Sequence, residues 1–381
     1  MTEHNDKQPL SLRMSRSVQQ TYTPDQVKWH YEHGLVLQSI YAVAKRYGCP
    51  DLTDWVRRMY DTKITADGGI LTYKEQEFNL DQIRPGVQLF DLDADTHAPQ
   101  YRKAIETLRE QLRGHPRTQS GGFWHKKIYP WQMWLDGLFM AEPFYARYVA
   151  EFGPESDYED IVHQFELMYA HARDERTGLL YHAWDESCKQ LWADVETGRA
   201  PHVWGRAMGW FCMALLDVLD WIPDTDACRP WRNRLTVIAD SLVQPLLTFQ
   251  DKGQGLWYQV VDMGTKPGNY LETSASAMFV YFLFKLVRLH LLSPAAGKTE
   301  AEVLAAARKG YEGLCSRLSE EAGILHLSGI CKVAGLGGTP YRDGSYQYYV
   351  GEPVVSDDFK GVGPFIFASL ESEAASEAAD H

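Results

Sequence analysis

The chain has 381 residues, of which 45% are apolar and 13% aromatic, enough to build a large buried core. Its formal net charge of -13 argues against nucleic acid and anionic membrane surfaces as partners, because binding to phosphate groups requires clustered Lys and Arg. The polar residues 1–7 do not resemble a signal peptide, and the six cysteines form no CxxC pair. These features predict a cytoplasmic protein without disulfides.

Six segments along the chain share one pattern, in which aromatic or polar residues and then small residues lead into an apolar helical run. Helices that are apolar on all sides, with small residues that permit close approach, are typical of a protein interior. The pattern therefore predicts a ring of inner helices. Its copies cover residues 29–41, 85–90 (the weakest), 133–141, 203–215, 271–280 and 359–368.

Between these segments, other helical patterns carry charges on one face and apolar residues on the opposite face. They cover residues 101–112, 158–172, 231–248 and 301–318. This arrangement predicts outer helices that pack on the inner ring.

A third recurring element is a glycine followed by aliphatic and then aromatic or imidazole residues. It begins at Gly69, Gly178, Gly255 and Gly323, and it predicts short extended loops at one rim. Together the three elements predict an all-α fold, a six-hairpin (α/α)6 toroid with short β loops at one rim. We expect one catalytic barrel domain over residues 23–370, with a polar N-terminal tail (1–22) and a C-terminal tail (371–381) that add nothing to the core.

Two aspartates are the candidate catalytic residues. Asp136 lies between tryptophans and the start of an apolar helical run, where loss of solvation favours a protonated carboxyl group. Asp81 has a similar setting, and the two acids can converge at one end of a barrel. The alternative is that each aspartate only caps a helix.

Further candidates lie at the starts of the inner helices and on the glycine loops. Aromatic faces beside a fixed guanidinium group suit a flat ring that bears a carboxylate, such as a sugar acid. Ordinary packing is the alternative for Trp210, and a structural role is the alternative for His125 and His182. The candidates are His125, Lys126, Trp134, Tyr181, His182, Trp204, Arg206 and Trp210.

Other chemistries find little support in the sequence. His163 and His171 have no evident third partner for a metal ion, and the chain contains no HExxH, phosphate-binding or GxSxG motif. The sequence therefore favours acid/base catalysis by carboxylates, with neither a metal nor a cofactor.

Several motifs resemble those of glycoside hydrolase family 105, the unsaturated rhamnogalacturonyl hydrolases. They are residues 129–140, 181–186, 203–210, 341–349 and 360–365, and the similarity extends from about residue 25 to 370. The resemblance implies a six-hairpin barrel that removes a 4,5-unsaturated uronic acid, most simply galacturonyl from rhamnogalacturonan (pectin) oligosaccharides. The segment around His33 does not align securely with the family pattern.

The resemblance also assigns roles to residues. Asp136 corresponds to the general acid/base of the family and Asp81 to its companion acid. The acid would protonate C4 of the sugar, and water would then add at C5, so that one carboxyl group serves in both steps. The residues that match the substrate pocket are His125, Lys126, Trp134, His182, Trp204, Arg206 and Trp210.

Alternative functions stay open at this point. One is an unsaturated glucuronyl hydrolase that acts on glycosaminoglycan or other lyase products, since the cations of the pocket do not separate galacturonyl from glucuronyl substrates. Others are a sugar epimerase, a non-catalytic carbohydrate-binding toroid and a helical interaction scaffold. In the first three of these four cases, as in the preferred one, the partner is a carbohydrate.

Overall fold

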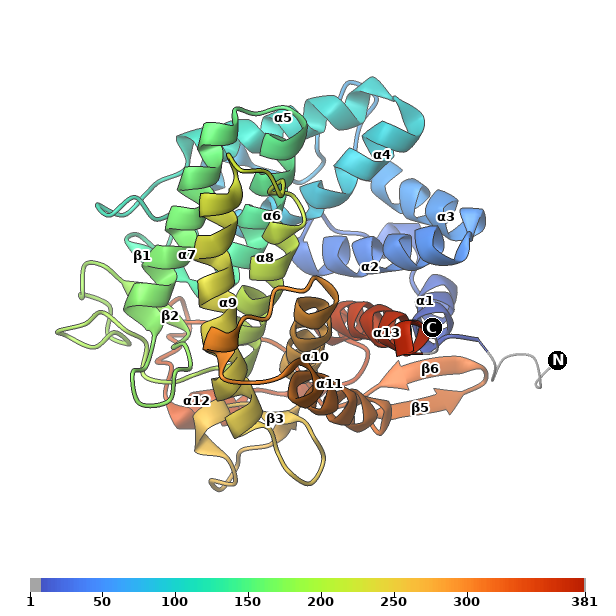
Figure 1. Cartoon of the computed structure of the whole chain (residues 1–381). Coiled ribbons are helices and arrows are strands. Elements are labelled where there is room, and N and C mark those ends of the chain that lie inside the picture. Colours follow the sequence, from blue (N-terminus) through green and yellow to red (C-terminus); the bar gives the residue numbers. More distant parts are fainter. Residues whose placement is uncertain (1–7, 380–381) are drawn as a thin grey trace.

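The computed structural model describes residues 8–379 (Figure 1). Within them, six helical segments form an inner ring in which each packs on the next and the last packs on the first. All six overlap the segments predicted for the inside, so the predicted toroid is confirmed. The inner segments are α2 (Tyr31–Tyr47), η4 (Arg84–Gln88) with α4 (Leu89–Thr96), α6 (Leu135–Glu151), α8 (Gly205–Leu219), α10 (Thr273–Arg288) and α13 (Phe359–Ala379).

Small residues bring the inner helices close together, as the contact between α8 and α10 shows. A Cβ atom at Gly209 would lie only 2.8 Å from Cβ of Met278, so any side chain here would push the helices apart. Helix α10 is buried from Thr273 to Val287. Despite this apolar interior, no helix within residues 8–379 is both long and apolar enough to cross a bilayer.

An outer layer of amphipathic helices covers the inner ring. Its members are α1 (Leu10–Thr21), α3 (Pro50–Asp61), α5 (Pro99–Gly114), α7 (Tyr158–Ala172), α9 (Arg229–Phe249) and α11 (Glu300–Cys315). The sequence patterns predicted α5, α7, α9 and α11. The remaining two, α1 and α3, both pack on α2.

The prediction that both ends of the chain add nothing to the core was wrong for the described residues. Helix α1 lies beside α13 (Figure 1) and buries Met14 and Val18 in the core. Helix α13 continues through the predicted C-terminal tail, where Glu371 is buried and pairs with Arg288 at 2.6 Å. The two ends thus close the ring. Residues 1–7 and 380–381 of the predicted tails lie outside the described residues.

Short antiparallel strand pairs connect the helices. In the loops after the outer helices, Gly178, Gly255 and Gly323 have φ values of 74°, 74° and 80°, a region that favours glycine. In the first loop the positive φ belongs to Gly68 rather than to the predicted Gly69. The pairs are β1 (Gln132–Trp134) with β2 (Ala183–Asp185), β3 (Trp257–Tyr258) with β4 (Leu271–Glu272), β5 (Leu318–Glu321) with β6 (Ile324–Leu327), and β7 (Ile330–Cys331) with β8 (Val354–Val355). The short helices are η1 (Pro24–Gln26), η2 (Glu75–Glu77), η3 (Leu80–Gln82), η5 (Glu155–Asp157), η6 (Val261–Met263), η7 (Pro294–Ala296) and α12 (Tyr346–Gly351).

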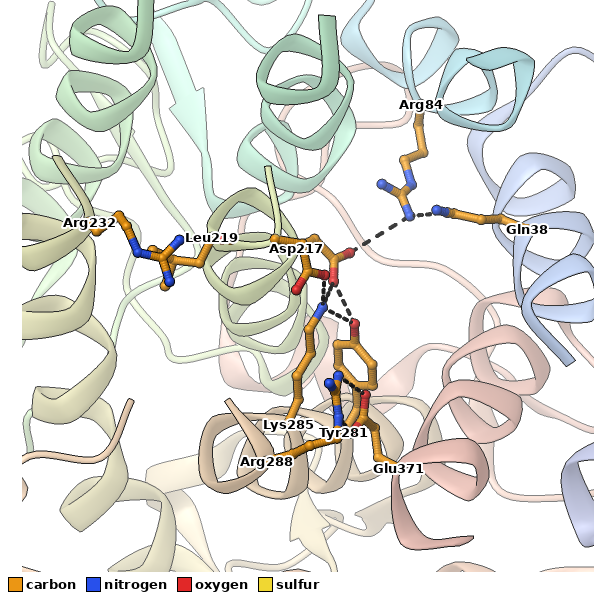
Figure 2. Close-up of polar contacts among 10 residues, drawn as sticks. Gln38, Arg84, Asp217, Leu219, Arg232, Tyr281, Lys285, Arg288 and Glu371 are labelled. Atoms are coloured by element: carbon orange, nitrogen blue, oxygen red, sulfur yellow. Dashed lines mark hydrogen bonds and ion pairs between the residues drawn. The ribbon is translucent and has the colours of Figure 1, made fainter. Parts of the chain in front are cut away.

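A group of polar residues around the buried Lys285 links the inner helices near the C-terminal ends of α8 and α10 (Figure 2). The Lys285 ammonium group donates to Asp217 at 2.9 Å, to Asp220 at 2.6 Å and to the Tyr281 hydroxyl at 2.7 Å. On α8, Asp217 lies eleven positions after Arg206, which corresponds to about 16 Å along a helix. This inner polar cluster therefore lies far from the end at which α8 begins.

Candidate active site

Asp136 is the second residue of α6, the helix that directly follows strand β1. Its backbone position is fixed by the strand pair, because the Leu135 amide donates to the carbonyl oxygen of His182 at 3.1 Å. The residue is buried, at 8% exposed.

The Asp136 carboxyl group faces the His182 ring. Its Oδ2 atom lies 3.3 Å from His182 Nε2, and neither atom has an aligned hydrogen-bond partner in residues 8–379. The opposite ring nitrogen, Nδ1, contacts the Tyr349 hydroxyl at 2.7 Å. An acid whose oxygen is buried but not consumed by a neighbouring donor can exchange a proton with a bound molecule.

Asp81, in η3, instead forms an ion pair with a lysine and lies beside a histidine. Its Oδ2 atom lies 2.5 Å from Lys126 Nζ, and its Oδ1 atom lies 3.6 Å from His125 Nε2. Burial raises the pKa of Asp81, but the charge of Lys126, with help from His125 and His30, outweighs burial and lowers the pKa to about 2. Asp81 therefore stays ionised at neutral pH.

The segment around His125 brings the two acids to one place. The Leu80 amide donates to the His125 carbonyl oxygen at 3.2 Å, and the His125 amide donates to the Gln132 carbonyl oxygen at 2.8 Å. The charges of Asp81 and Asp136 both act on the His125 ring, although burial lowers its pKa to about 4. His125 is therefore a neutral spacer between the acids at neutral pH.

Aromatic rings form one wall of the site. Trp134 stacks on His125 with ring centres 4.5 Å apart and on Tyr129 at 5.0 Å, and its edge faces His182. The Trp204 ring lies 4.8 Å from that of His182 and 6.0 Å from that of Tyr349. The structure thus places both predicted tryptophans around His182, next to Asp136.

Arg206, the second residue of α8, is fully buried. It donates one hydrogen bond to the Cys331 carbonyl oxygen and lies over the Trp204 ring at 5.3 Å. Its Nε and Nη1 atoms have no hydrogen-bond partner within residues 8–379. Unpaired guanidinium nitrogens are costly to bury, and these two nitrogens can still donate hydrogen bonds to an anion.

Two predicted residues do not reach the site directly. Trp210 is 1% exposed and stacks on Phe139 at 4.5 Å, which supports the packing interpretation. The Tyr181 ring lies beneath the Arg199 guanidinium group at 5.5 Å and lines a neighbouring cavity with Trp192. The segment around His33, which did not align securely with the family pattern, reaches the site through other residues. His33 itself contacts Tyr22.

Sequence reasoning missed Tyr31, His30 and Tyr349. Burial and the carboxylates of Asp81 and Glu32 raise the pKa of Tyr31 well above its ordinary value, and the charges of Arg206 and Asp136 also act on its hydroxyl group. His30 Nε2 lies 3.9 Å from Asp81. The aromatic and polar start of the 29–41 segment was a signal for Tyr31 and His30. Tyr349 lies in the 341–349 motif, but the sequence assigned no role to it.

A cavity of about 750 Å³ opens beside this site and includes Arg173, Trp184 and Arg199 in its lining. Neither Asp81 nor Asp136 lines it. Trp184 pairs with Met133, one position before Trp134, and successive strand residues project to opposite faces. The cavity therefore lies on the other face of the β1–β2 pair. We assign the candidate active site to the region around Asp136 because that region contains the candidate acids.

Comparisons with known proteins identify the family of this chain. The family model described as Glycosyl Hydrolase Family 88 matches residues 7–375. A solved glycoside hydrolase from family 105 of C. acetobutylicum is 44% identical and has a TM-score of 0.91, with 96% of this chain and 100% of that chain covered. The unsaturated rhamnogalacturonyl hydrolase YesR of Bacillus subtilis is 25% identical over 331 residues, which cover 84% of this chain and 87% of YesR. A solved unsaturated glucuronyl hydrolase specific for heparin shares the fold, with a TM-score of 0.65, 12% identity, and 96% and 95% of the two chains covered.

Proposed function

We propose that this chain, a member of glycoside hydrolase family 105 and thereby an unsaturated uronyl hydrolase, removes unsaturated galacturonyl residues from rhamnogalacturonan oligosaccharides. Its sequence also matches the family model described as Glycosyl Hydrolase Family 88. We further propose that Asp136 is the general acid/base and Asp81 its companion. The substrate is the 4,5-unsaturated uronate at the non-reducing end of a chain cut by a polysaccharide lyase.

The observation that carries the proposal is the unpartnered Oδ2 atom of the buried Asp136 carboxyl group, beside His182. In such a substrate C4 is the electron-rich carbon of an enol ether. Protonation of C4 by Asp136 leaves an oxocarbenium ion at C5. The resulting Asp136 carboxylate then takes a proton from water as the water oxygen adds to C5. The hemiketal opens, and the remaining oligosaccharide leaves.

Asp81 has a different task in this scheme, because its charge is fixed. A carboxylate with a pKa of about 2 cannot donate a proton at neutral pH. It can accept a hydrogen bond from the attacking water or from a sugar hydroxyl group. The short Lys126 contact keeps its orientation constant through both steps.

Arg206 supplies recognition of the substrate carboxylate. Two of its nitrogens are unpaired and buried, and its guanidinium plane lies over Trp204. Both Arg206 and Asp136 act electrostatically on the Tyr31 hydroxyl group, so both charges lie within electrostatic range of Tyr31. A carboxylate bound by Arg206 would therefore hold the sugar ring next to the acid.

The galacturonyl preference is supported by the similarity to YesR along most of both chains. The test is a panel of unsaturated products from rhamnogalacturonan, homogalacturonan and glycosaminoglycan lyases, followed by loss of the enol-ether absorbance. We expect the fastest turnover on rhamnogalacturonan products. Faster turnover on glycosaminoglycan products would overturn the galacturonyl assignment, with the glucuronyl alternative taking its place.

The route through C4 has its own test. In deuterated water, the proposed chemistry places one deuterium at C4 of the released sugar, which NMR can detect. A product without deuterium at C4 would contradict protonation of this carbon.

A further inference from the structure

The structure contains a Tyr–His–Asp arrangement that the proposed chemistry has not yet used. Tyr349 Oη lies 2.7 Å from His182 Nδ1, and His182 Nε2 lies 3.3 Å from Asp136 Oδ2. We propose that Tyr349 is a positioning residue for the reaction. Its hydroxyl group donates to Nδ1 and fixes the histidine tautomer with the proton on Nε2. This places an N–H group 3.3 Å from the Asp136 carboxylate, close enough for electrostatic stabilisation without an aligned hydrogen bond. This proposal rests on the proposed function of Asp136.

Tyr349 is held firmly enough for this task. It is fully buried in α12, and its ring is stacked against Trp204 with an interplanar angle of 21°. Its backbone carbonyl accepts a hydrogen bond from the Gln259 amide group at 3.0 Å, and the same Gln259 side chain accepts one from Trp204 Nε1 at 3.1 Å. Tyr349 and Trp204 are therefore fixed by one shared neighbour.

His182 is fixed equally well. It is 0% exposed, its amide donates to the His202 carbonyl oxygen at 3.2 Å, and its carbonyl accepts from Leu135 at the start of α6. The ring has little freedom to turn, because Trp134 meets it at 5.4 Å and Trp204 at 4.8 Å. The relative positions of the His182 ring and the Asp136 carboxyl group are thus set by the backbone.

The direction of the first hydrogen bond follows from the charges. Burial raises the pKa of Tyr349 well above its ordinary value, so the hydroxyl group keeps its proton. If Nδ1 were the donor, Nε2 would present a lone pair to the Asp136 carboxylate after proton transfer to the substrate. With the hydroxyl group as donor, Nε2–H faces that carboxylate, which is favourable.

The other charged or titratable groups near this arrangement do not replace Tyr349. Those that act on Tyr349 besides Asp136 are Tyr348, Arg342 and Asp343. None of these three contacts His182 Nδ1 by a hydrogen bond in the described residues. On the opposite side, His125 lies between Asp136 and Asp81 and is neutral at neutral pH.

The test uses Tyr349→Phe, which keeps the ring stacked on Trp204 and removes only the hydroxyl group. We expect kcat to fall about tenfold with KM changed less than about twofold. One hydrogen bond of the Tyr–His–Asp arrangement is lost, and no substrate contact is removed. The alkaline limb of the kcat profile should move to higher pH, because a carboxyl group that loses a donor gives up its proton less readily.

The matched control is Tyr348→Phe. The Tyr348 hydroxyl group accepts from the Gly335 amide at 3.0 Å, not from His182, so this variant should keep the wild-type kcat and pH profile. In a His182→Gln background, Tyr349→Phe should have no further effect on kcat. A Tyr349→Phe variant with unchanged kcat would overturn the positioning role of Tyr349. A kcat profile whose alkaline limb does not move, or moves to lower pH, would also overturn it.

A second measurement does not depend on turnover. It therefore distinguishes failure of the positioning role of Tyr349 from failure of the proposed function. Long-range ¹H–¹⁵N NMR of histidine-labelled protein reports which ring nitrogen carries the proton, and His182→Gln assigns the signal. We expect wild-type His182 to be protonated on Nε2 and Tyr349→Phe to show a mixture of tautomers. A proton on Nδ1 in the wild-type protein, or an identical tautomer in the variant, would refute the proposal.

Discussion

The ammonium group of Lys126 lies 2.5 Å from the carboxylate of Asp81, whereas Asp136 has no cation at such a distance in the described residues. Of two buried acids in one site, one is thus held ionised and the other faces a histidine. This difference in surroundings is the basis of the separate roles that we propose for them, as in other sites that use carboxyl groups for distinct tasks. It also leads to a measurable pH dependence of stability.

Asp81 should stabilise the folded state at neutral pH and lose that effect in acid. Its pKa falls from an ordinary 3.8 to about 2 on folding, which corresponds to about 2 kcal/mol. The contribution is complete above about pH 4 and is lost as the pH falls toward 2. Urea unfolding of the wild-type protein and Asp81→Asn should show a stability difference that shrinks in this window. A difference independent of pH would contradict the ion pair.

Replacement of Arg206 by Lys should impair recognition of the uronate. Lysine keeps a positive charge but lacks the planar fork that can bind both carboxylate oxygens. We expect kcat/KM to fall about 10- to 100-fold, in line with the loss of one charged hydrogen bond. Inhibition by a saturated uronic acid should weaken in parallel, whereas equal inhibition of both proteins would show that Arg206 does not bind the carboxylate.

Lys285→Met should destabilise the protein without altering its chemistry. The substitution leaves Asp217 and Asp220 without their buried cation in the inner polar cluster, and loss of one partner of a buried pair costs about 3–5 kcal/mol. Chemical denaturation measures this loss. The control is Lys74→Met at an exposed position, where we expect a change within about 0.5 kcal/mol. Similar stabilities of the two variants would argue against the cluster as a structural element.

Helix α1 should contribute to the stability of the whole ring. Met14→Ala removes a side chain that is 1% exposed, and such substitutions cost about 2–5 kcal/mol. Gln20→Ala on the exposed face of the same helix is the control. If Met14→Ala unfolded at the same denaturant concentration as this control, α1 would be a dispensable tail after all.

The sequence predicted the inner helices well because their pattern is local. Small residues such as Gly209 allow close helix contact, and the apolar run that follows each of them requires burial on all sides. Family membership and glycoside hydrolase activity, which the motifs around Asp136 and Arg206 indicated, are confirmed. Helix α1 was missed because Leu10–Thr21 is mostly polar and its apolar stripe is narrow.

The parts of the site that could not be predicted depend on contacts across the whole chain. Tyr349 and His182 are 167 positions apart and meet only when the ring closes. Likewise, the ionised state of Asp81 depends on Lys126, which is brought to it by the bridge between Asn79 and Lys126. Spacing along the sequence carries no signal for either contact.

The most direct test of the central claim is the kcat of Asp136→Asn on an unsaturated rhamnogalacturonan disaccharide, with circular dichroism to verify folding. Because Asn cannot donate the proton that C4 requires, we expect kcat to fall about 10²- to 10⁴-fold in a normally folded protein. A folded Asp136→Asn variant with near wild-type kcat, alongside an inactive Asp81→Asn variant, would contradict the account and reverse the two roles.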